Sequence, residues 1–204
     1  MEPFKTFTAV AVPIDPDNVD TDQILPARLM RKSRRDGLHA TYLFRDLRFN
    51  DDGSEKPYFI LNRPEFRKAR IIVGAKNYAC GSARPGAIYA HYDYGIRVLV
   101  VESMSDIFYR NCIKIGMLPV RLAGEAVAAF RAQLHERPGA TISADLDRQI
   151  VTGPSGTEHR FEIDAYAKRC LLRGLNNIAL TLEREAEIEA FEHTYYQAMP
   201  WLQQ

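Results

Sequence analysis

Apolar and polar positions alternate at the start of the chain and later give way to continuous apolar runs. TFTAVAVPI (residues 6–14) alternates and is rich in small and β-branched side chains, so it predicts a strand that ends at Pro13 and Pro16. In VDTDQILP (19–26), Asp and Thr precede a short apolar pair, which predicts one capped helical turn. Residues 36–64 hold many aromatic side chains without clear periodicity, and loops this long and hydrophobic usually have a function or cover another part of the molecule.

The middle of the chain predicts a strand, a loop, a helix and a second strand. ARIIVGA (69–75) and RVLVVES (97–103) are continuous apolar runs of strand length, as in a sheet that is covered on both faces. Between them, GAIYAHYDYG (86–95) predicts a helix. Ser105 is placed to cap the next helix, and Gly116 is placed to end it.

The last third of the chain alternates short strands with helices. LPVRL (118–122) predicts a strand, and apolar residues at helical spacing over 127–134 predict a helix. Residues 141–163 predict short antiparallel strands, and residues 165–198 predict helices. The sequence therefore predicts one α/β domain, in which helices flank a mixed sheet.

The net charge does not indicate a nucleic acid or an anionic membrane as the main partner, because 27 Lys and Arg balance 26 Asp and Glu. The exception is RLMRKSRR (28–35), which is either a solvated basic face or a surface that attracts an acidic ligand or partner. No segment is long and apolar enough to span a membrane, and the N-terminus lacks the pattern of a signal peptide. We therefore expect a cytoplasmic protein.

The three cysteines form neither a metal-binding nor a disulfide pattern. Cys80, Cys112 and Cys170 lie far apart in the sequence and include no Cys-x-x-Cys pair. Three reduced thiols fit this spacing best, and we expect this chain to bind no metal.

NYACGSARPGA (77–87) is the segment with candidate chemistry, and two interpretations of it fail. A nucleophile elbow of the Gly-x-Ser-x-Gly type is disfavoured because Arg84 stands where the second glycine is needed. A metal site is disfavoured because Cys80 offers a single ligand.

The same segment predicts an anion-binding loop. Pro85 suits the first turn of a helix, which places Ser82, Ala83 and Arg84 where free backbone N–H groups and the positive end of the helix dipole converge. The guanidinium of Arg84 adds a two-pronged match for a carboxylate. The alternative is that Ser82 only caps the helix and Arg84 is a solvated charge.

Four motifs in order give the chain a resemblance to a known family. VDTDQILPARLM, LFRDLRF, NYACGSAR and IFYRNCIKIGMLPV resemble the N-terminal signature, the aromatic substrate loop, the Gly-Ser-x-Arg loop and the following helix and strand of the small subunit of isopropylmalate dehydratase, in the aconitase superfamily. Four ordered motifs are more specific than any one of them.

The resemblance implies a fold, a partner and a reaction. The fold is a swivelling β/β/α domain of the aconitase C-terminal-domain type over residues 1–204, with a helical extension from about residue 165. This domain completes an active site on a separate large subunit that carries a 4Fe-4S cluster, so this chain itself would bind no cofactor. The reaction removes water from a small dicarboxylate, 2-isopropylmalate, and returns it to give 3-isopropylmalate in leucine biosynthesis.

Catalytic roles carry over from the family by motif. Ser82 would be the base that takes a proton from carbon, with its alkoxide stabilised by backbone N–H groups and by positive charge. Arg84 would hold a substrate carboxylate, and Gly81 and Ala83 would complete the loop around the substrate.

Two residues of the N-terminal motif are also implied in the site. Thr21 and Asp22 would position Ser82 or the substrate. The alternative is that they only cap the short helical turn after Asp20.

TYLFRDLRF (41–49) resembles the family segment that supplies the apolar pocket beside the carboxylate clamps, and this resemblance implies that it selects the substrate. Its apolar residues follow neither helical nor strand periodicity, so periodicity does not assign them all to the core. Leu43 and Leu47 would form the walls of a pocket for the isopropyl group, and Arg45 or Arg48 would face a carboxylate or the partner. The alternative is a satellite hydrophobic cluster beneath a long loop.

One stretch departs from the family pattern. Family members commonly read Ser-Arg-Glu-His-Ala where this chain reads ARPGA (83–87), so an acid and an imidazole are missing. This departure bears on the substrate more than on the reaction class. A hydro-lyase for citraconate, dimethylmaleate or homoaconitate is therefore the alternative function. A carboxylate-binding module without catalysis, which would keep Arg84 but not need Ser82, is a second alternative.

Overall fold

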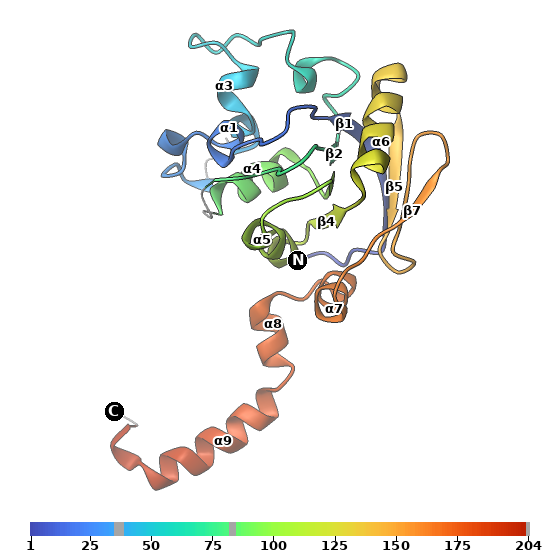
Figure 1. Cartoon of the computed structure of the whole chain (residues 1–204). Helices are drawn as coiled ribbons and strands as arrows, with labels where there is room; N and C mark the ends of the chain where they lie inside the picture. The colour runs from blue at the N-terminus through green and yellow to red at the C-terminus, as the bar shows by residue number, and fades with distance from the viewer. Residues whose placement is uncertain (35–38, 82–84, 203–204) are drawn as a thin grey trace.

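The computed structural model describes residues 1–34, 39–81 and 85–202. Within these residues, seven strands form one curled sheet in the order β4-β3-β2-β1-β5-β6-β7 (Figure 1). The strands are β1 (Thr6–Pro13), β2 (Ile71–Val73), β3 (Val98–Val101), β4 (Leu118–Arg121), β5 (Thr141–Asp145), β6 (Ile150–Thr152) and β7 (Glu158–Arg160).

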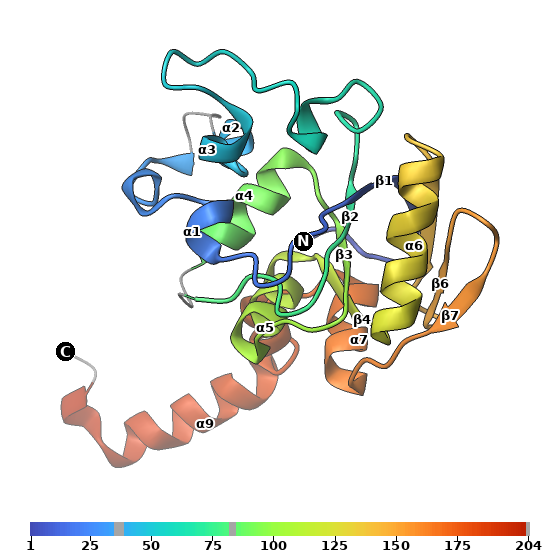
Figure 2. The ribbon, with the colours of Figure 1, turned by 45° about the horizontal axis from the view of Figure 1, so that its top comes forward.

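Helices lie on both sides of the parallel strands (Figures 1 and 2). The α-helices are α1 (Thr21–Ile24), α2 (His39–Tyr42), α3 (Arg45–Arg48), α4 (Gly86–Tyr94), α5 (Asp106–Ile115), α6 (Gly124–Glu136), α7 (Ala165–Arg173), α8 (Asn177–Leu182) and α9 (Glu185–Ala198). Short 3-10 turns are η1 (Ala27–Leu29), η3 (Ile60–Asn62) and η4 (Pro200–Leu202).

Strand β1 joins the two parts of the sheet. Its first part, Thr6–Val10, pairs antiparallel with β5, and its second part, Ala11–Pro13, pairs parallel with β2. Strands β3 and β4 continue the parallel part, and β6 and β7 continue the antiparallel part. The predicted mixed sheet is confirmed.

The continuous apolar runs fill a hydrophobic core on each side of the sheet. Successive side chains of a strand point to opposite faces, so Leu99 and Val101 join one cluster while Val98 and Val100 join the other. The first cluster lies against α1, α4 and α5, and the second lies against α6 and α7. Burial on both faces explains why these strands lack polar alternation.

Local signals set the helix ends. Ser105 caps α5 by accepting from the Phe108 N–H at 3.2 Å, and Gly116 ends that helix at a φ of +88°, as predicted. Helix α4 begins at Gly86, the first residue of the predicted helical run, so Pro85 precedes its first turn. Pro85 already has helical dihedral angles, with φ −71°, but stands at the N-cap position.

The chain after residue 165 forms three α-helices with different surroundings. Helix α7 packs on the body through Cys170 and Leu171. Helices α8 and α9 extend away from the body (Figures 1 and 2), and no residue of α9 is buried.

Candidate active site

The loops that follow β1, β2 and β3 meet at the carboxyl edge of the parallel strands. Asp20 and Cys80 form an isolated parallel bridge, in which the Thr21 N–H donates to the Cys80 carbonyl at 2.8 Å. The Tyr78 N–H donates to the Ser103 carbonyl at 2.9 Å. Ligands of open α/β sheets bind at this edge, so the structure brings the predicted motifs to a suitable place.

Two glycines allow these segments to approach closely. Gly81 has a φ of +97°, and a Cβ there would lie 2.3 Å from Asp20 Oδ2 and 3.2 Å from Thr21 Oγ1. A Cβ on Gly86 would lie 2.7 Å from Leu25 Cδ2. Since a side chain would collide at both positions, the glycines hold the loop and the start of α4 directly against α1.

The cap of α1 is supplied by Asp20. Its carboxylate accepts from the Asp22 N–H at 2.7 Å, and the Gln23 side chain accepts in return from the Asp20 N–H at 3.0 Å. Thr21 is buried in the first turn, and Asp22 is exposed there. The residue that caps α1 is therefore Asp20, and neither Thr21 nor Asp22 occupies the cap position.

The residues with the central predicted roles, Ser82, Ala83 and Arg84, lie outside the described residues. Their flanking residues are described: Gly81 adjoins the N-terminus of α1, and Pro85 stands at the N-cap of α4. The roles of the three residues stay predictions.

A buried tyrosine–histidine pair joins the loop after β2 to α4. The Tyr78 hydroxyl donates to His91 Nε2 at 2.8 Å, and His91 Nδ1 donates to the Ala87 carbonyl at 2.7 Å. The carbonyl can only accept, so the neutral imidazole carries its proton on Nδ1. Burial lowers the pKa of His91 to about 4, which keeps the ring neutral.

This pair was not predicted from the sequence. The available signal was a histidine within an apolar helical stretch, four residues after an alanine whose carbonyl it reaches. Its tyrosine partner lies across the loop and could not be assigned from the spacing. The pair fixes both ends of the loop to one rigid element.

The two leucines of the predicted substrate loop have different surroundings. Leu43 has 0% of its surface exposed and packs in the main core, whereas Leu47 is 39% exposed. Leu43 therefore supports the loop from inside, and Leu47 is the leucine available to a substrate or partner. The inward side chains join the main core, so the alternative of a separate satellite cluster does not apply.

The two arginines of this loop also differ. Arg48 is buried, where its Nε donates to Asn62 Oδ1 at 3.1 Å and its Nη1 donates to the Leu43 carbonyl at 3.3 Å. Arg45 is half-buried, with its guanidinium 4.4 Å from the centre of the Phe49 ring. Of the two, Arg45 is placed to meet a ligand at the surface.

The basic segment 28–35 is partly neutralised within the chain. Arg28 pairs with Asp46 of α3, and Arg34 pairs with Asp93 of α4 at 2.6 Å. Arg35 lies outside the described residues. The other cations of the segment are exposed and have no ion-pair partner in the described part of the chain: Arg31 and Lys32.

The described residues do not fit a metal cluster. They include no group of three or more His, Cys, Asp or Glu side chains that could hold a metal ion. An iron–sulfur cluster takes several thiolates, whereas Cys112 and Cys170 are buried separately and Cys80 is half-buried. Burial raises the pKa of Cys112, which acts as a small apolar residue. No helix among the described residues could span a membrane.

Comparison with known proteins extends these observations. Three families match consecutive parts of the chain: Aconitase C-terminal domain over residues 1–125, LeuD_N over 128–165, and the C-terminal domain of the 3-isopropylmalate dehydratase small subunit over 177–204. The 3-isopropylmalate dehydratase small subunits of Jannaschia sp. (strain CCS1) and Paramagnetospirillum magneticum are 45% and 44% identical over 202 residues, which is 99% of this chain and 100% of each relative.

A solved structure has the same fold. The 3-isopropylmalate dehydratase (leuD) from Methanocaldococcus jannaschii superposes with a TM-score of 0.65 over 92% of this chain and 99% of that chain. At 21% identity this likeness concerns the fold alone.

The mixed sheet, the loops gathered at its carboxyl edge and the match over residues 1–125 define a class: the chain belongs to the aconitase C-terminal domain family. Within this class, the chain belongs to the family of 3-isopropylmalate dehydratase small subunits, whose members it matches from end to end. The family and fold class predicted from the four sequence motifs are confirmed.

Proposed function

We propose that the chain is the small subunit of a cytoplasmic hydro-lyase that isomerises 2-isopropylmalate to 3-isopropylmalate in leucine biosynthesis. The observation that carries this proposal is the 45% identity to a protein of that name over 99% of the chain. The arrangement of the loops after β1 and β2 supports it, because Gly81 is held against the start of α1 by contacts that exclude a side chain.

In this proposal the enzyme is complete only with its large subunit. The described residues of this chain do not fit a cluster, so the 4Fe-4S cluster is assigned to the large subunit. When bound there, the cluster supplies a Lewis acid for the departing hydroxyl group. This chain supplies the base and the groups that hold the substrate.

Ser82 is the proposed base. Its deprotonated Oγ takes the proton from the carbon beside the one that bears the hydroxyl, the C–O bond breaks, and the departing hydroxide takes up a proton from the medium, so that water and an unsaturated dicarboxylate result. Return of water with the opposite orientation gives the isomer. Backbone N–H groups at the start of α4 and the charge of Arg84 stabilise the alkoxide, and Arg84 holds a substrate carboxylate.

Other residues shape the proposed site. Thr21 stands beside Gly81, and Asp22 follows it in the first turn of α1, so in this proposal they position Ser82 or the substrate. Leu47 provides apolar surface for the isopropyl group, and Arg45 meets a carboxylate or the partner.

The test is reconstitution with the large subunit of the same organism. The chain alone and the large subunit alone should be inactive, and the complex should convert 2-isopropylmalate. Citraconate, dimethylmaleate and homoaconitate belong in the same assay, because Pro85 and Gly86 replace the Glu-His of the family pattern. A higher kcat/KM for one of these substrates would replace the proposed substrate, and activity of the isolated chain would contradict the shared active site.

A further inference from the structure

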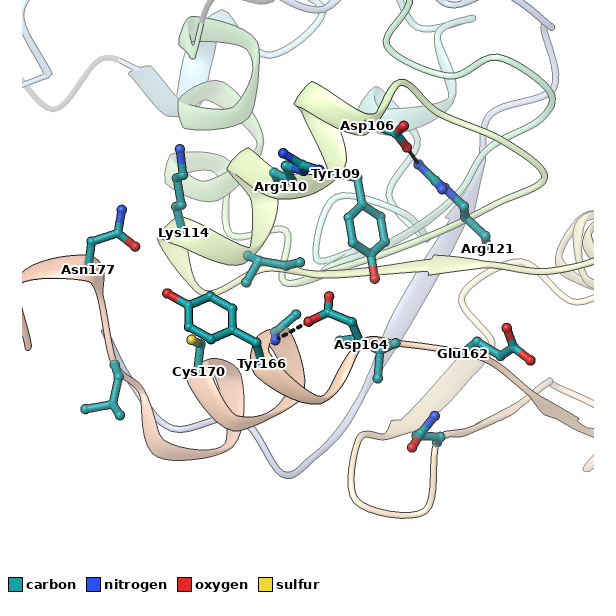
Figure 3. Close-up of a pocket in the computed structure, with 15 residues that line it drawn as sticks. Asp106, Tyr109, Arg110, Lys114, Arg121, Glu162, Asp164, Tyr166, Cys170 and Asn177 are labelled. Atoms are coloured by element: carbon teal, nitrogen blue, oxygen red, sulfur yellow. Dashed lines mark hydrogen bonds and ion pairs between the residues drawn. The ribbon is translucent and has the colours of Figure 1, made fainter. Parts of the chain in front are cut away.

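A cavity of about 1000 Å³ lies between α5 and α7, outside the candidate active site (Figure 3). Helix α5 contributes Asp106, Arg110 and Lys114, while Tyr166 of α7 and Asn177 at the start of α8 form the opposite wall. None of these residues has a role in the proposed reaction.

A second cavity, of about 820 Å³, continues this one along the inner side of the C-terminal arm, which we define as residues 177–202. Tyr166 and Asn177 line both cavities. The wall then continues along α9 through Ile188, Phe191 and Tyr195. We call the two cavities together the arm hollow.

The arm presents apolar side chains without cover from the body. Phe191 is 65% exposed and Trp201 is 66% exposed, and no residue of α9 is buried. An isolated helix of this length is marginally stable in water, and contiguous exposed apolar surface marks an interaction site. These features are typical of a surface that binds another protein.

The root of the arm is fixed, while its outer helix carries uncompensated negative charge. Glu183, at the end of α8, pairs with Arg173 of α7 at 2.6 Å and also with Arg169. The acids of α9 have no ion-pair partner among the described residues: Glu185, Glu187, Glu189 and Glu192. Charge complementarity therefore favours, over α9, a partner that offers apolar side chains together with basic ones.

We infer that the arm hollow is a docking surface for the large subunit, an inference that rests on the proposed function. The hollow starts at the active-site edge, because Asp106 opens α5 just after Ser103, which accepts hydrogen bonds from the Asn77 and Tyr78 N–H groups. From there it runs along α5 to the arm, which extends away from α6 and lies on the far side of α5 from α1 in both views (Figures 1 and 2). A body that covers the active site and continues over α5 therefore also meets the hollow.

A second copy of the chain fits the arm less well. In a two-fold dimer whose axis passes through α9, each acidic helix would face the same acidic helix of the other copy. Like charges placed across an interface oppose association, whereas a basic surface on a different protein does not meet this obstacle.

The experiment measures the Kd for the large subunit of two full-length chains, the wild type and the double variant Ile188→Glu/Phe191→Glu, and compares the two values. We expect the Kd to rise about tenfold or more, because charges replace central apolar contacts. The matched control is Ala128→Glu/Ala129→Glu, which adds the same charge to exposed positions of α6, on the other side of the molecule. The control should bind within about twofold of wild type. Trp201→Ser, outside α9, gives a second variant that does not depend on the stability of that helix.

An unchanged Kd in both arm variants would overturn the inference. So would a wild-type dimer that the double variant dissociates without a change in affinity for the large subunit, because the occupant would then be a second copy. The proposed function fails separately, if the complex forms with an intact arm and yet converts no 2-isopropylmalate. A wild-type chain that binds no large subunit would overturn both.

Discussion

Gly81 shows how a single residue determines the geometry of the candidate site. Its positive φ favours glycine, and the missing side chain lets the loop lie against the Asp20 carboxylate that caps α1. The Asp20 carboxylate therefore both caps α1 and contacts Gly81. A side chain at position 81 would push the loop away from this carboxylate. The residues that follow Gly81 are those for which we propose the catalytic roles.

Ser82→Ala should lower the kcat of the assembled enzyme by several orders of magnitude, because it removes the proposed base. Folding and the affinity for the large subunit should stay unchanged. Steady-state kinetics of the complex give the measurement. Cys80→Ala, two residues earlier, is the control and should keep most of the activity. Near wild-type turnover in Ser82→Ala would sink the assignment of the base.

Arg84→Lys should raise KM and lower kcat for the dicarboxylate, because an ammonium group cannot reproduce the two-pronged contact of a guanidinium. The loss is expected to be on the order of 1.5–3 kcal/mol in transition-state stabilisation, as for hydrogen bonds to charged groups. Arg31→Lys, an exposed arginine, provides the control. Unchanged kinetic constants in Arg84→Lys would make Arg84 a surface charge.

Acidification should destabilise the fold through His91. Burial lowers the pKa of His91 from 6.5 to about 4, so between these values the unfolded chain binds a proton that the folded chain does not. The contribution of the neutral ring is complete above about pH 6.5 and is lost toward pH 4, by about 3 kcal/mol. Urea unfolding of wild type and His91→Gln across this range measures the effect.

The variant should show a shallower dependence of unfolding free energy on pH than wild type. His193→Gln, an exposed histidine of α9, is the matched control and should keep the wild-type slope. Equal slopes in wild type and His91→Gln would show that another group causes the effect.

At the scale of elements, features set by neighbouring residues could be predicted from the sequence, whereas features set by tertiary packing could not. The strand–loop–helix–strand unit and the ends of α5 could be predicted because apolar runs, Ser105 and Gly116 act within a few residues of their own position. The segment 41–49 could not be resolved in the same way. Whether Leu43 or Leu47 points inward depends on elements distant in the sequence. The Tyr78–His91 pair was missed for the same reason.

Leu43→Ala and Leu47→Ala should therefore separate stability from specificity. Removing the buried Leu43 side chain should cost about 2–5 kcal/mol of unfolding free energy. Leu47→Ala should leave stability nearly unchanged and shift the preference for isopropylmalate over a methyl-substituted malate, by about 1–3 kcal/mol per methylene of lost contact.

Chemical denaturation gives the stability of both variants, and the ratio of kcat/KM for the two substrates gives the specificity. An unchanged ratio in Leu47→Ala would remove the loop from substrate selection and assign that role to the large subunit.

The whole molecule combines a packed body with an arm that has no core of its own. The family matches divide in a similar place, since one ends at residue 165 and the next begins at residue 177. A helix without buried residues opens with little cost in free energy. The arm is therefore the part of the molecule whose order depends most on a partner.

Amides of α9 should exchange rapidly with deuterium in the free chain and slowly in the complex with the large subunit. The expected protection is about tenfold or more, since the helix gains buried contacts on binding. Mass spectrometry of peptides from α9 and from α6 provides the measurement and its internal control. Equal exchange of α9 in both states would contradict a role for the arm in assembly.

The pairing of β1 with both β2 and β5 also has a consequence for folding during synthesis on the ribosome. This strand is made before the other strands, yet its first part finds its partner only when residues 141–145 have been synthesised. Until then Thr6–Val10 is an exposed edge that other chains can pair with. Such a high contact order slows folding, so a chain that stops before residue 141 should aggregate rather than form a smaller stable domain.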